Sequence, residues 1–353
     1  MSLDVIPYSV DDLPALGLFF KKHYPAPGEY GTMGHFQWKI LENPVMPGLI
    51  NLVKDGNRIV SATSVTPKKL YLGGVPRTAA EIGDTYTDPA YQRKGLFALL
   101  INRSTQEAFS RGVEFIYGTP NDQSLPGYEK KANYQVIDGM DVSSYSLPLN
   151  LKPLLQPRTG RLPGSILATL YDALFSIRQA FRKASSRKVG GAIEELKSMP
   201  EDWDAFWRRA RAPFDFIMAR DRDIMEWRYF QNPWTFRFYV LKQGQEITAC
   251  IVCRFVLDPA LSTLVIADYL ALPGRKDDLK PLLVRVIEDG LQADVAKVSA
   301  WCVRGGPYAP VFQSMGFLER SRIPVISYRN DLTRLISETC KTWHFTVGDS
   351  DNV

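Results

Sequence analysis

The sequence has few residues of the kinds that build disulfide frameworks and metal sites. Its 353 residues include four cysteines and three histidines. Cys250 and Cys253 form a C-x-x-C, but they lie in a strand-like run where positions i and i+3 point to opposite faces, and no second pair completes a zinc site. His23, His35 and His344 have no metal-ligand spacing. We therefore expect neither a metal nor a redox role.

Long apolar runs and a strong net charge are also missing. No run of about 18 apolar residues could cross a membrane, and the start Met1-Ser2-Leu3-Asp4 lacks the basic and apolar regions of a signal peptide. The net charge is +5, with 45% hydrophobic and 23% charged residues. That composition predicts ordinary globular domains. Without a signal peptide or a membrane-spanning run, we expect a cytoplasmic protein. The positive excess suits an anionic ligand and is too weak to indicate nucleic acid.

The chain is organised around the segment 81–100. Residues 85–87 favour a strand, Asp88-Pro89 ends it, and Leu96 begins the apolar face of a helix. The loop between them is Gln92-Arg93-Lys94-Gly95. A loop that opens a helix presents unpaired backbone N–H groups and the positive end of the helix dipole, and two cations add to this. It is a candidate anion site, although the same residues can also solvate an ordinary strand-to-helix connection.

Gln92-Arg93-Lys94-Gly95-Leu96-Phe97 resembles the pyrophosphate loop (Gln/Arg-x-x-Gly-x-Gly/Ala) of the GCN5-related N-acetyltransferases (GNAT), which bind coenzyme A through loop amides. Phe97 stands where that family has a small residue. Residues 117–121 (Tyr-Gly-Thr-Pro-Asn) are similar to the family's next strand and its splayed end. Residues 128–134 (Tyr-Glu-Lys-Lys-Ala-Asn-Tyr) are similar to the segment that follows. The resemblance implies a GNAT fold and acyl-CoA-dependent N-acyl transfer without a metal.

The resemblance also implies roles for single residues. Glu81 lies 11 positions before Gln92, the spacing at which histone-acetylating members carry their general base, and Asp84 is the second candidate. Tyr128 is the candidate acid that protonates the departing thiolate. Backbone amides near residues 85–87 would hold the pantetheine arm and polarise the thioester oxygen. The predicted donor-binding residues are Thr85, Tyr86, Thr87, Gln92, Arg93, Lys94, Gly95, Leu96, Phe97 and Asn121.

These catalytic candidates also have a purely structural interpretation. Glu81 and Asp84 can be satisfied by neighbouring strands or by Arg77, and Tyr128 can be an ordinary packing residue. No Ser–His–Asp pattern is present, and no Cys is set beside a His. Direct transfer in a ternary complex is therefore favoured over an acyl-enzyme.

The second half of the sequence repeats the first. Trp38 matches Trp227 at an offset of 189, and Asp84 matches Asp268 at an offset of 184. A slowly shrinking offset is what small loop deletions in a duplicated domain produce. We expect an α/β protein with two tandem GNAT-like mixed-sheet domains. The expected ranges are an N-terminal domain 1–147 with the acyl-CoA site, a helical linker 148–192, and a degenerate C-terminal domain 193–353 that walls the acceptor side.

The second copy lacks the residues of the donor site. Its loop reads Gly274-Arg275-Lys276-Asp277-Asp278, in which two carboxylates would repel a pyrophosphate. Phe312 lies near the place of Tyr128. We therefore expect one coenzyme A site, in the N-terminal copy.

The linker contains a stretch with helical periodicity from about 165 to 184, with a basic end. Such a helix can lie on an anionic membrane, but it more often packs on its own protein, and we favour packing. The aromatic stretch 203–207 is interpreted as core or domain interface.

Three further segments resemble a bacterial tandem acyltransferase group found with surface-polysaccharide biosynthesis: 220–229, Asn232-Pro233 and 343–351. That resemblance implies transfer of an acetyl or other short acyl group to the amine of a nucleotide-linked amino sugar, such as a dTDP-3-amino-3,6-dideoxyhexose. The alternatives are another amine, such as an aminoglycoside or a peptide N-terminus, and a non-catalytic binding module. Either a monomer or a homodimer is compatible with the duplication.

Overall fold

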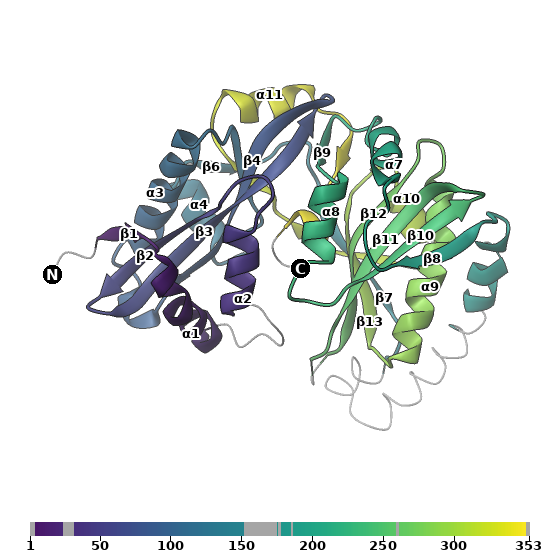
Figure 1. Cartoon of the computed structure of the whole chain (residues 1–353), viewed down its shortest axis with the longest axis horizontal. Helices are drawn as coiled ribbons and strands as arrows, with labels where there is room; N and C mark the ends of the chain where they lie inside the picture. Colours follow the sequence, from purple (N-terminus) through teal and green to yellow (C-terminus); the bar gives the residue numbers. More distant parts are fainter. Residues whose placement is uncertain are drawn as a thin grey trace. The chain divides into compact units, whose positions relative to one another are not determined.

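Two compact units make up the chain. The computed structural model describes residues 4–23, 32–151, 175, 178–184, 186–258 and 261–350 (Figure 1). The first unit comprises Met1–Asp141, Phe214–Trp234 and Ile323–Trp343, and the second comprises Val142–Pro213, Thr235–Arg322 and His344–Val353. Each unit thus takes segments from both halves of the chain, whereas the expected domain ranges were contiguous. The periodic stretch expected at 165–184 lies mostly outside the described residues.

The first unit is built on a mixed sheet. Its strands follow the order β1 (Val5–Pro7), β2 (Leu49–Asp55), β3 (Arg58–Leu72), β4 (Val75–Thr87), β5 (Phe115–Gly118), β15 (Ile326–Tyr328) and β6 (Tyr134–Val136). Along this order the neighbours are antiparallel except β4 and β5, which run parallel. Strand β9 (Phe216–Met218) pairs with the end of β3, and β16 (Trp343–His344) pairs with β9.

Helices cover both faces of this sheet. On one face lie α3 (Leu96–Ser110) and α4 (Leu125–Lys131); on the other lie α1 (Leu13–His23) and α2 (Met33–Phe36), which continues as a π turn over Gln37–Leu41 (Figure 1). The unit also contains α8 (Arg222–Tyr229) and α11 (Asp331–Thr339). A tight turn at Asp55-Gly56 joins β2 to β3, where Asp55 pairs with Arg58 and Gly56 has a φ of 59°, which favours glycine.

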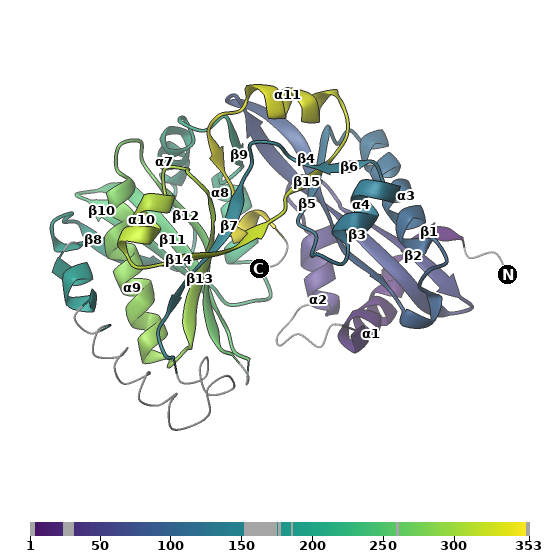
Figure 2. The same ribbon diagram turned by 180° about the vertical axis from the view of Figure 1, so that it is seen from behind.

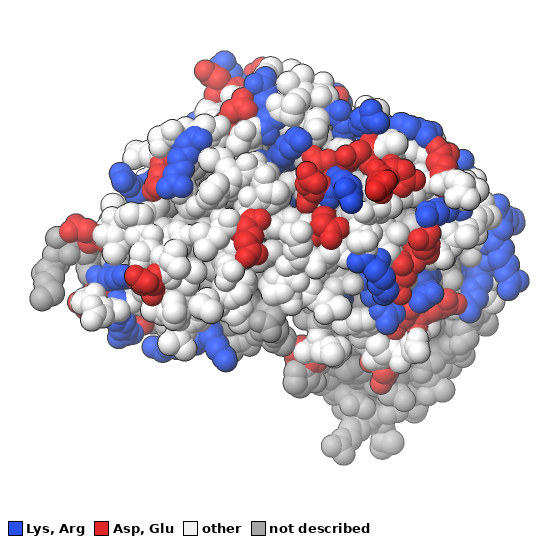
Figure 3. Space-filling view, in the orientation of Figure 1, with Lys and Arg blue, Asp and Glu red and all other residues white. Residues whose placement is uncertain are grey.

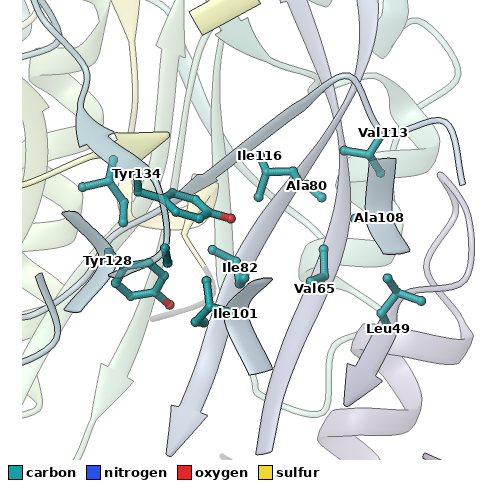
Figure 4. Packing of buried hydrophobic residues seen from close by; sticks show 12 residues of the cluster. Leu49, Val65, Ala80, Ile82, Ile101, Ala108, Val113, Ile116, Tyr128 and Tyr134 are labelled. Atoms are coloured by element: carbon teal, nitrogen blue, oxygen red, sulfur yellow. The ribbon is translucent and has the colours of Figure 1, made fainter. Parts of the chain in front are cut away.

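The core between the sheet and α3 with α4 is formed by aliphatic residues and two tyrosines. Ile82 from β4, Ile101 from α3, and Tyr128 and Tyr134 lie in one buried cluster (Figure 4). The cluster on the opposite face includes Ala62 of β3 together with residues of α1 and α2. The mixed sheet of the first unit, called sheet 1 below, is therefore buried on both sides.

The second unit repeats this architecture. Its strands follow the order β8 (Ala192–Leu196), β10 (Arg237–Gln243), β11 (Glu246–Val256), β12 (Thr263–Ala271), β13 (Lys297–Val303), β7 (Val142–Pro148) and β14 (Leu318–Ile323). Strands β12 and β13 are parallel, as β4 and β5 are. The helices α7 (Trp203–Ala210), α9 (Leu279–Gln292) and α10 (Ala309–Ser314) belong to this unit. The repeat predicted from the sequence is confirmed: both sheets have the same strand order.

Each half of the chain contributes strands to the sheet of the other half: the C-terminal half adds β15, β9 and β16 to sheet 1, and the N-terminal half adds β7 to sheet 2. Sheet 1 holds β15, from the C-terminal half, between β5 and β6, and Figure 2 shows this strand in yellow among the blue strands. Sheet 2 holds β7, from the N-terminal half, between β13 and β14. The exchange is reciprocal, because β7 and β15 occupy the same place in the two strand orders. It explains why the compact units are not contiguous in sequence.

The matching tryptophans of the two copies stack on each other within the first unit. The rings of Trp38 and Trp227 are 4.6 Å apart at their centroids and 17° from parallel. Trp38 Nε1 donates to the Trp227 carbonyl at 2.9 Å, and Trp227 Nε1 donates to the Trp38 carbonyl at 3.2 Å. Both side chains are buried. Each indole therefore satisfies its N–H on the backbone of its counterpart, which a buried tryptophan requires.

Candidate active site

The predicted pyrophosphate loop lies between β4 and α3. Arg93 and Gly95 have left-handed backbone conformations, with φ of 63° and 83°. Gly95 is the N-cap of α3 and has no side chain of its own to cap the helix. Because the first N–H groups of a helix have no partner within the helix, the loop offers donors and the positive dipole end to an anion. This geometry fits a coenzyme A pyrophosphate.

Side chains of the loop are tied to the strand that precedes it. Gln92 Nε2 donates to the Thr87 carbonyl at 3.2 Å. Lys94 Nζ lies 4.6 Å from the centroid of the Tyr91 ring, and the Tyr91 hydroxyl donates to Asp55. The two cations of the loop therefore lie beside the N-terminus of α3 on an anchored backbone.

Strands β4 and β5 separate immediately beside this loop. Their parallel pairing ends with Glu81 opposite Tyr117, although β4 continues to Thr87 and β5 ends at Gly118. Among the described residues, the last part of β4 thus extends beyond its pairing with β5. The splayed end predicted at residues 117–121 is confirmed.

A β-bulge interrupts β4 within this part. Ser64 pairs with Gly83 and Ala62 pairs with Tyr86, so that two residues of β4, Asp84 and Thr85, lie opposite one residue of β3. Asp84 has a φ of 48°. Because side chains alternate along a strand, the extra residue moves every later side chain of β4 to the other face of the sheet.

Asp84 is held in a buried ion pair. Lys39 Nζ lies 2.5 Å from Asp84 Oδ2, with side-chain exposures of 0% and 4%. Ser64 Oγ donates to the same carboxylate oxygen at 2.6 Å. Lys39 comes from the π turn that follows α2, so the bulge of β4 is tied to the helical layer on that face.

Glu81 also lies beside a buried lysine. Lys68 Nζ is 3.8 Å from Glu81 Oε2, and both side chains are 3% exposed. Thr119 Oγ1, just beyond the end of β5, donates to Glu81 Oε1 at 3.4 Å. The carboxylate therefore reaches the point where β4 and β5 separate. The alternative partner Arg77 pairs with Glu114 instead, at 2.8 Å.

Tyr128 joins the core to the part of β4 beyond its pairing with β5. Its ring packs against Phe97 and Tyr134, at centroid distances of 5.1 and 5.3 Å. Its hydroxyl lies 3.3 Å from Thr85 Oγ1, and Thr85 Oγ1 lies 2.7 Å from Thr63 Oγ1. The structure thus places the predicted acid and the predicted pantetheine strand in hydrogen-bond contact.

The remaining predicted residues have structural contacts. The Phe97 ring fills the space over Gly127, where an added Cβ would lie 2.8 Å from Phe97 Cε1, which accounts for a large residue at a position that is small in the GNAT pattern. Asn121 Oδ1 accepts from the N–H groups of Gln123 and Ser124, at 3.1 and 3.0 Å, immediately before α4. Asn121 therefore shapes the turn that carries Tyr128.

Sequence reasoning missed the two lysines. Lys39 and Lys68 lie in segments whose patterns predict burial, and a buried lysine requires a partner of opposite charge. The signal was available at Lys39, because the Trp38 repeat marks its segment as packed. The carboxylate that each lysine contacts depends on strand register. Local sequence patterns do not predict this register.

The corresponding loop of the second copy has a different structure. Asp278 is the N-cap residue of α9, is buried, and accepts from Arg275 Nε at 2.9 Å. At the end of β12 the Tyr308 hydroxyl accepts from the Ala271 N–H at 3.1 Å and donates to the Ala271 carbonyl at 3.3 Å. In the second copy, protein groups therefore bond to this loop and to this strand end.

A pocket of about 380 Å³ lies elsewhere in the first unit, at the hairpin end of β3 and β4, and is lined by residues including Lys69, Thr78 and Asp221. It is separate from the loop and from Tyr128, and we assign it no part in the chemistry. Lys and Arg are interspersed with Asp and Glu over the face drawn in Figure 3. That face offers no single-sign stripe of the kind that tracks a nucleic acid backbone.

The described residues contain no group of three or more His, Cys, Asp and Glu that could hold a metal ion. None of their helices combines the length and the apolar character that a membrane crossing requires.

Comparisons with known proteins agree with this geometry. Residues 20–137 match the model of the acetyltransferase (GNAT) domain. A GCN5-related N-acetyltransferase from Anabaena variabilis superimposes with a TM-score of 0.63 at 13% identity, covering 95% of this chain and 75% of that one. The N-myristoyltransferase of Saccharomyces cerevisiae with bound myristoyl-CoA gives 0.65 at 15% identity, covering 97% and 88%. No curated protein sequence matches the chain.

Residues 20–137 are therefore similar to a GNAT acetyltransferase domain, and the whole chain shares the fold of these acyltransferase structures. The enzyme class that this domain defines is the acyl-CoA-dependent N-acyltransferase.

Proposed function

We propose that the first unit binds an acyl-CoA along β4 and the loop 92–97 and transfers its acyl group directly to an amine. The observation that supports this most strongly is the left-handed glycine N-cap of α3 beside the part of β4 that extends beyond its pairing with β5. The pyrophosphate would accept hydrogen bonds from the amides of the loop, and the pantetheine arm would pair with residues 85–87. Glu81 and Tyr128 both reach this strand end.

The proposed reaction assigns one proton transfer to each of these residues. Glu81 accepts the extra proton of the ammonium form, directly or through one water, so that a neutral amine attacks the thioester carbonyl. The C–N bond forms and the C–S bond breaks. Tyr128 gives its proton to the sulfur, producing the free thiol, and regains a proton from the nitrogen as the amide forms. Backbone N–H groups of β4 stabilise the carbonyl oxygen as its charge develops.

For the acceptor we propose an amine carried on an anionic molecule, such as a nucleotide-linked amino sugar. Lys39 and Lys68 neutralise Asp84 and Glu81, and Arg93 and Lys94 add positive charge nearby. A site with this balance does not favour a cationic acceptor such as an aminoglycoside, because a cation is bound best by uncompensated carboxylates. The acyl group is proposed to be acetyl or another short chain, and one donor is bound per chain.

Titration calorimetry and a turnover assay with a panel of acceptors test these assignments. We expect Glu81→Gln to keep coenzyme A affinity and to lower turnover, most of all at low pH, where more of the amine is protonated. Rates that match the wild type at every pH would remove Glu81 as the base. The acceptor panel contains nucleotide-linked amino sugars, aminoglycosides and peptides, and turnover confined to the cationic aminoglycosides would contradict the anionic acceptor.

A further inference from the structure

The bulge in β4 decides which side chain faces Tyr128. Without the extra residue, Thr85 would lie on the same face as Glu81, and Tyr86 would point toward α3 and α4. With it, Thr85 contacts Tyr128 on the face of α3 and α4. Tyr86 packs on the opposite face, where its ring lies 5.8 Å from Phe19 and 4.7 Å from His23, both in α1.

The bulge is expensive for the backbone unless something holds it. A left-handed conformation at a residue other than glycine is unfavourable for the backbone. At Asp84 the cost is offset by the Lys39 ammonium at 2.5 Å and the Ser64 hydroxyl at 2.6 Å. A buried ion pair contributes little net stability relative to apolar residues, but it can fix one register among alternatives. The Lys39–Asp84 pair lies at the bulge. The bulge decides whether Thr85 or Tyr86 faces Tyr128.

We propose that Lys39 and Asp84 form a register lock: the pair holds the β4 bulge in the arrangement in which Thr85 orients the Tyr128 hydroxyl toward the donor thioester. Lys39 and Asp84 are then positioning residues, and Asp84 is not the base. Thr63 completes the chain of hydroxyls that orients Thr85. The catalytic part of this inference rests on the proposed function. The structural part, that the ion pair holds the bulge of β4, does not depend on it.

The lock is tested with the double variant Lys39→Met/Asp84→Asn, because removing both charges avoids leaving one charge buried alone. The matched control is Lys69→Met/Asp221→Asn, a second lysine–aspartate pair of the first unit, 2.9 Å apart and outside the proposed site. Hydrogen exchange followed by mass spectrometry needs no acceptor. We expect faster exchange in residues 83–87 in the lock variant and unchanged exchange there in the control. Unchanged exchange in the lock variant overturns the lock.

Turnover in a coupled set of variants tests the positioning role. We expect Tyr128→Phe to lower kcat at least about 100-fold in the wild type and in the control background. In the lock variant the same substitution should lower kcat much less, because Tyr128 is already misplaced, while the Kd for coenzyme A changes little. An equal factor in all three backgrounds refutes positioning through Tyr128. A wild-type protein that neither binds coenzyme A nor acylates any acceptor refutes the proposed function instead, and the exchange experiment still decides the lock.

Discussion

Replacing Gly95 with aspartate separates the donor-binding role of the loop from its folding role. Gly95 has a φ of 83°, and a Cβ at this position meets no heavy atom within 4 Å. An added side chain therefore causes no clash within the protein. The folded state bears only the backbone cost of the left-handed conformation, about 1 kcal/mol.

The effect on coenzyme A should be much larger than the effect on folding. A carboxylate at roughly 5 Å from one negative charge of the pyrophosphate, with an effective dielectric constant of about 20, raises the binding free energy by about 3 kcal/mol. That corresponds to a rise in Kd of more than about 100-fold. The new side chain also fills the space through which the phosphates approach the loop amides.

Gly112 supplies the matched control. It follows the other end of α3, has a φ of 90°, and also meets nothing within 4 Å of an added Cβ. Gly112→Asp should therefore lower the melting temperature about as much as Gly95→Asp while leaving the Kd for coenzyme A unchanged. Asp277→Gly, in the corresponding loop of the second copy, should leave it unchanged as well.

Titration calorimetry with coenzyme A, combined with thermal melts of the three variants, measures both quantities. Equal affinity in Gly95→Asp and the wild type would refute the placement of the pyrophosphate on this loop. A loss of affinity in Asp277→Gly would refute the proposal of one donor site in the first copy.

Three further predictions concern folding and pH. Trp38→Ala should lower the free energy of unfolding in urea by about 3–5 kcal/mol. Adding Trp227→Ala should cost less than the sum of the two single losses, because the two rings share one contact. Strict additivity would argue against the reciprocal pair. Residues 1–151 expressed alone should lack a cooperative thermal transition by circular dichroism, because β15 is missing; a sharp transition would show that β15 is dispensable. Burial lowers the pKa of His23 below its usual 6.5, so the unfolded chain takes up a proton at a higher pH than the native state does. Stability should therefore fall as pH drops through 6.5 and level off below the native pKa. His23→Gln should flatten this part of the plot of melting temperature against pH, and an unchanged slope would exclude His23 as its source.

Local sequence patterns were sufficient for the duplicated fold and for the position of the loop that opens α3. Gly95 at the start of α3 and Asp55-Gly56 in a hairpin are positions where backbone geometry selects the residue, so the residue reveals the geometry. The tryptophan repeat gave the duplication, and the structure adds that Trp38 and Trp227 contact each other. The strand exchange left no such trace, because β7 and β15 have ordinary strand patterns whichever sheet receives them.

The electrostatic part of the site could not be predicted in the same way. Arg77 was one partner considered for Glu81, yet the structure places Lys68 beside Glu81, and Lys39 approaches Asp84 from 45 residues away. These pairs depend on the β3–β4 register and on the bulge. A shift of one residue would exchange the faces and break both pairs, so only the folded arrangement reveals them.

The reciprocal strand exchange also constrains how the chain can be made. On a ribosome, β6 ends at Val136 and its neighbour β15 begins at Ile326, which is 326 − 136 = 190 positions later. At a synthesis rate of about 5–20 residues per second, the edge of β5 remains unpaired for roughly 10–40 s until its partner strand is made. During that interval a nascent first unit exposes unpaired backbone that can capture a strand from another chain. Slower translation near the C-terminal end would therefore raise the yield of misassembled protein without changing a single contact in the native state.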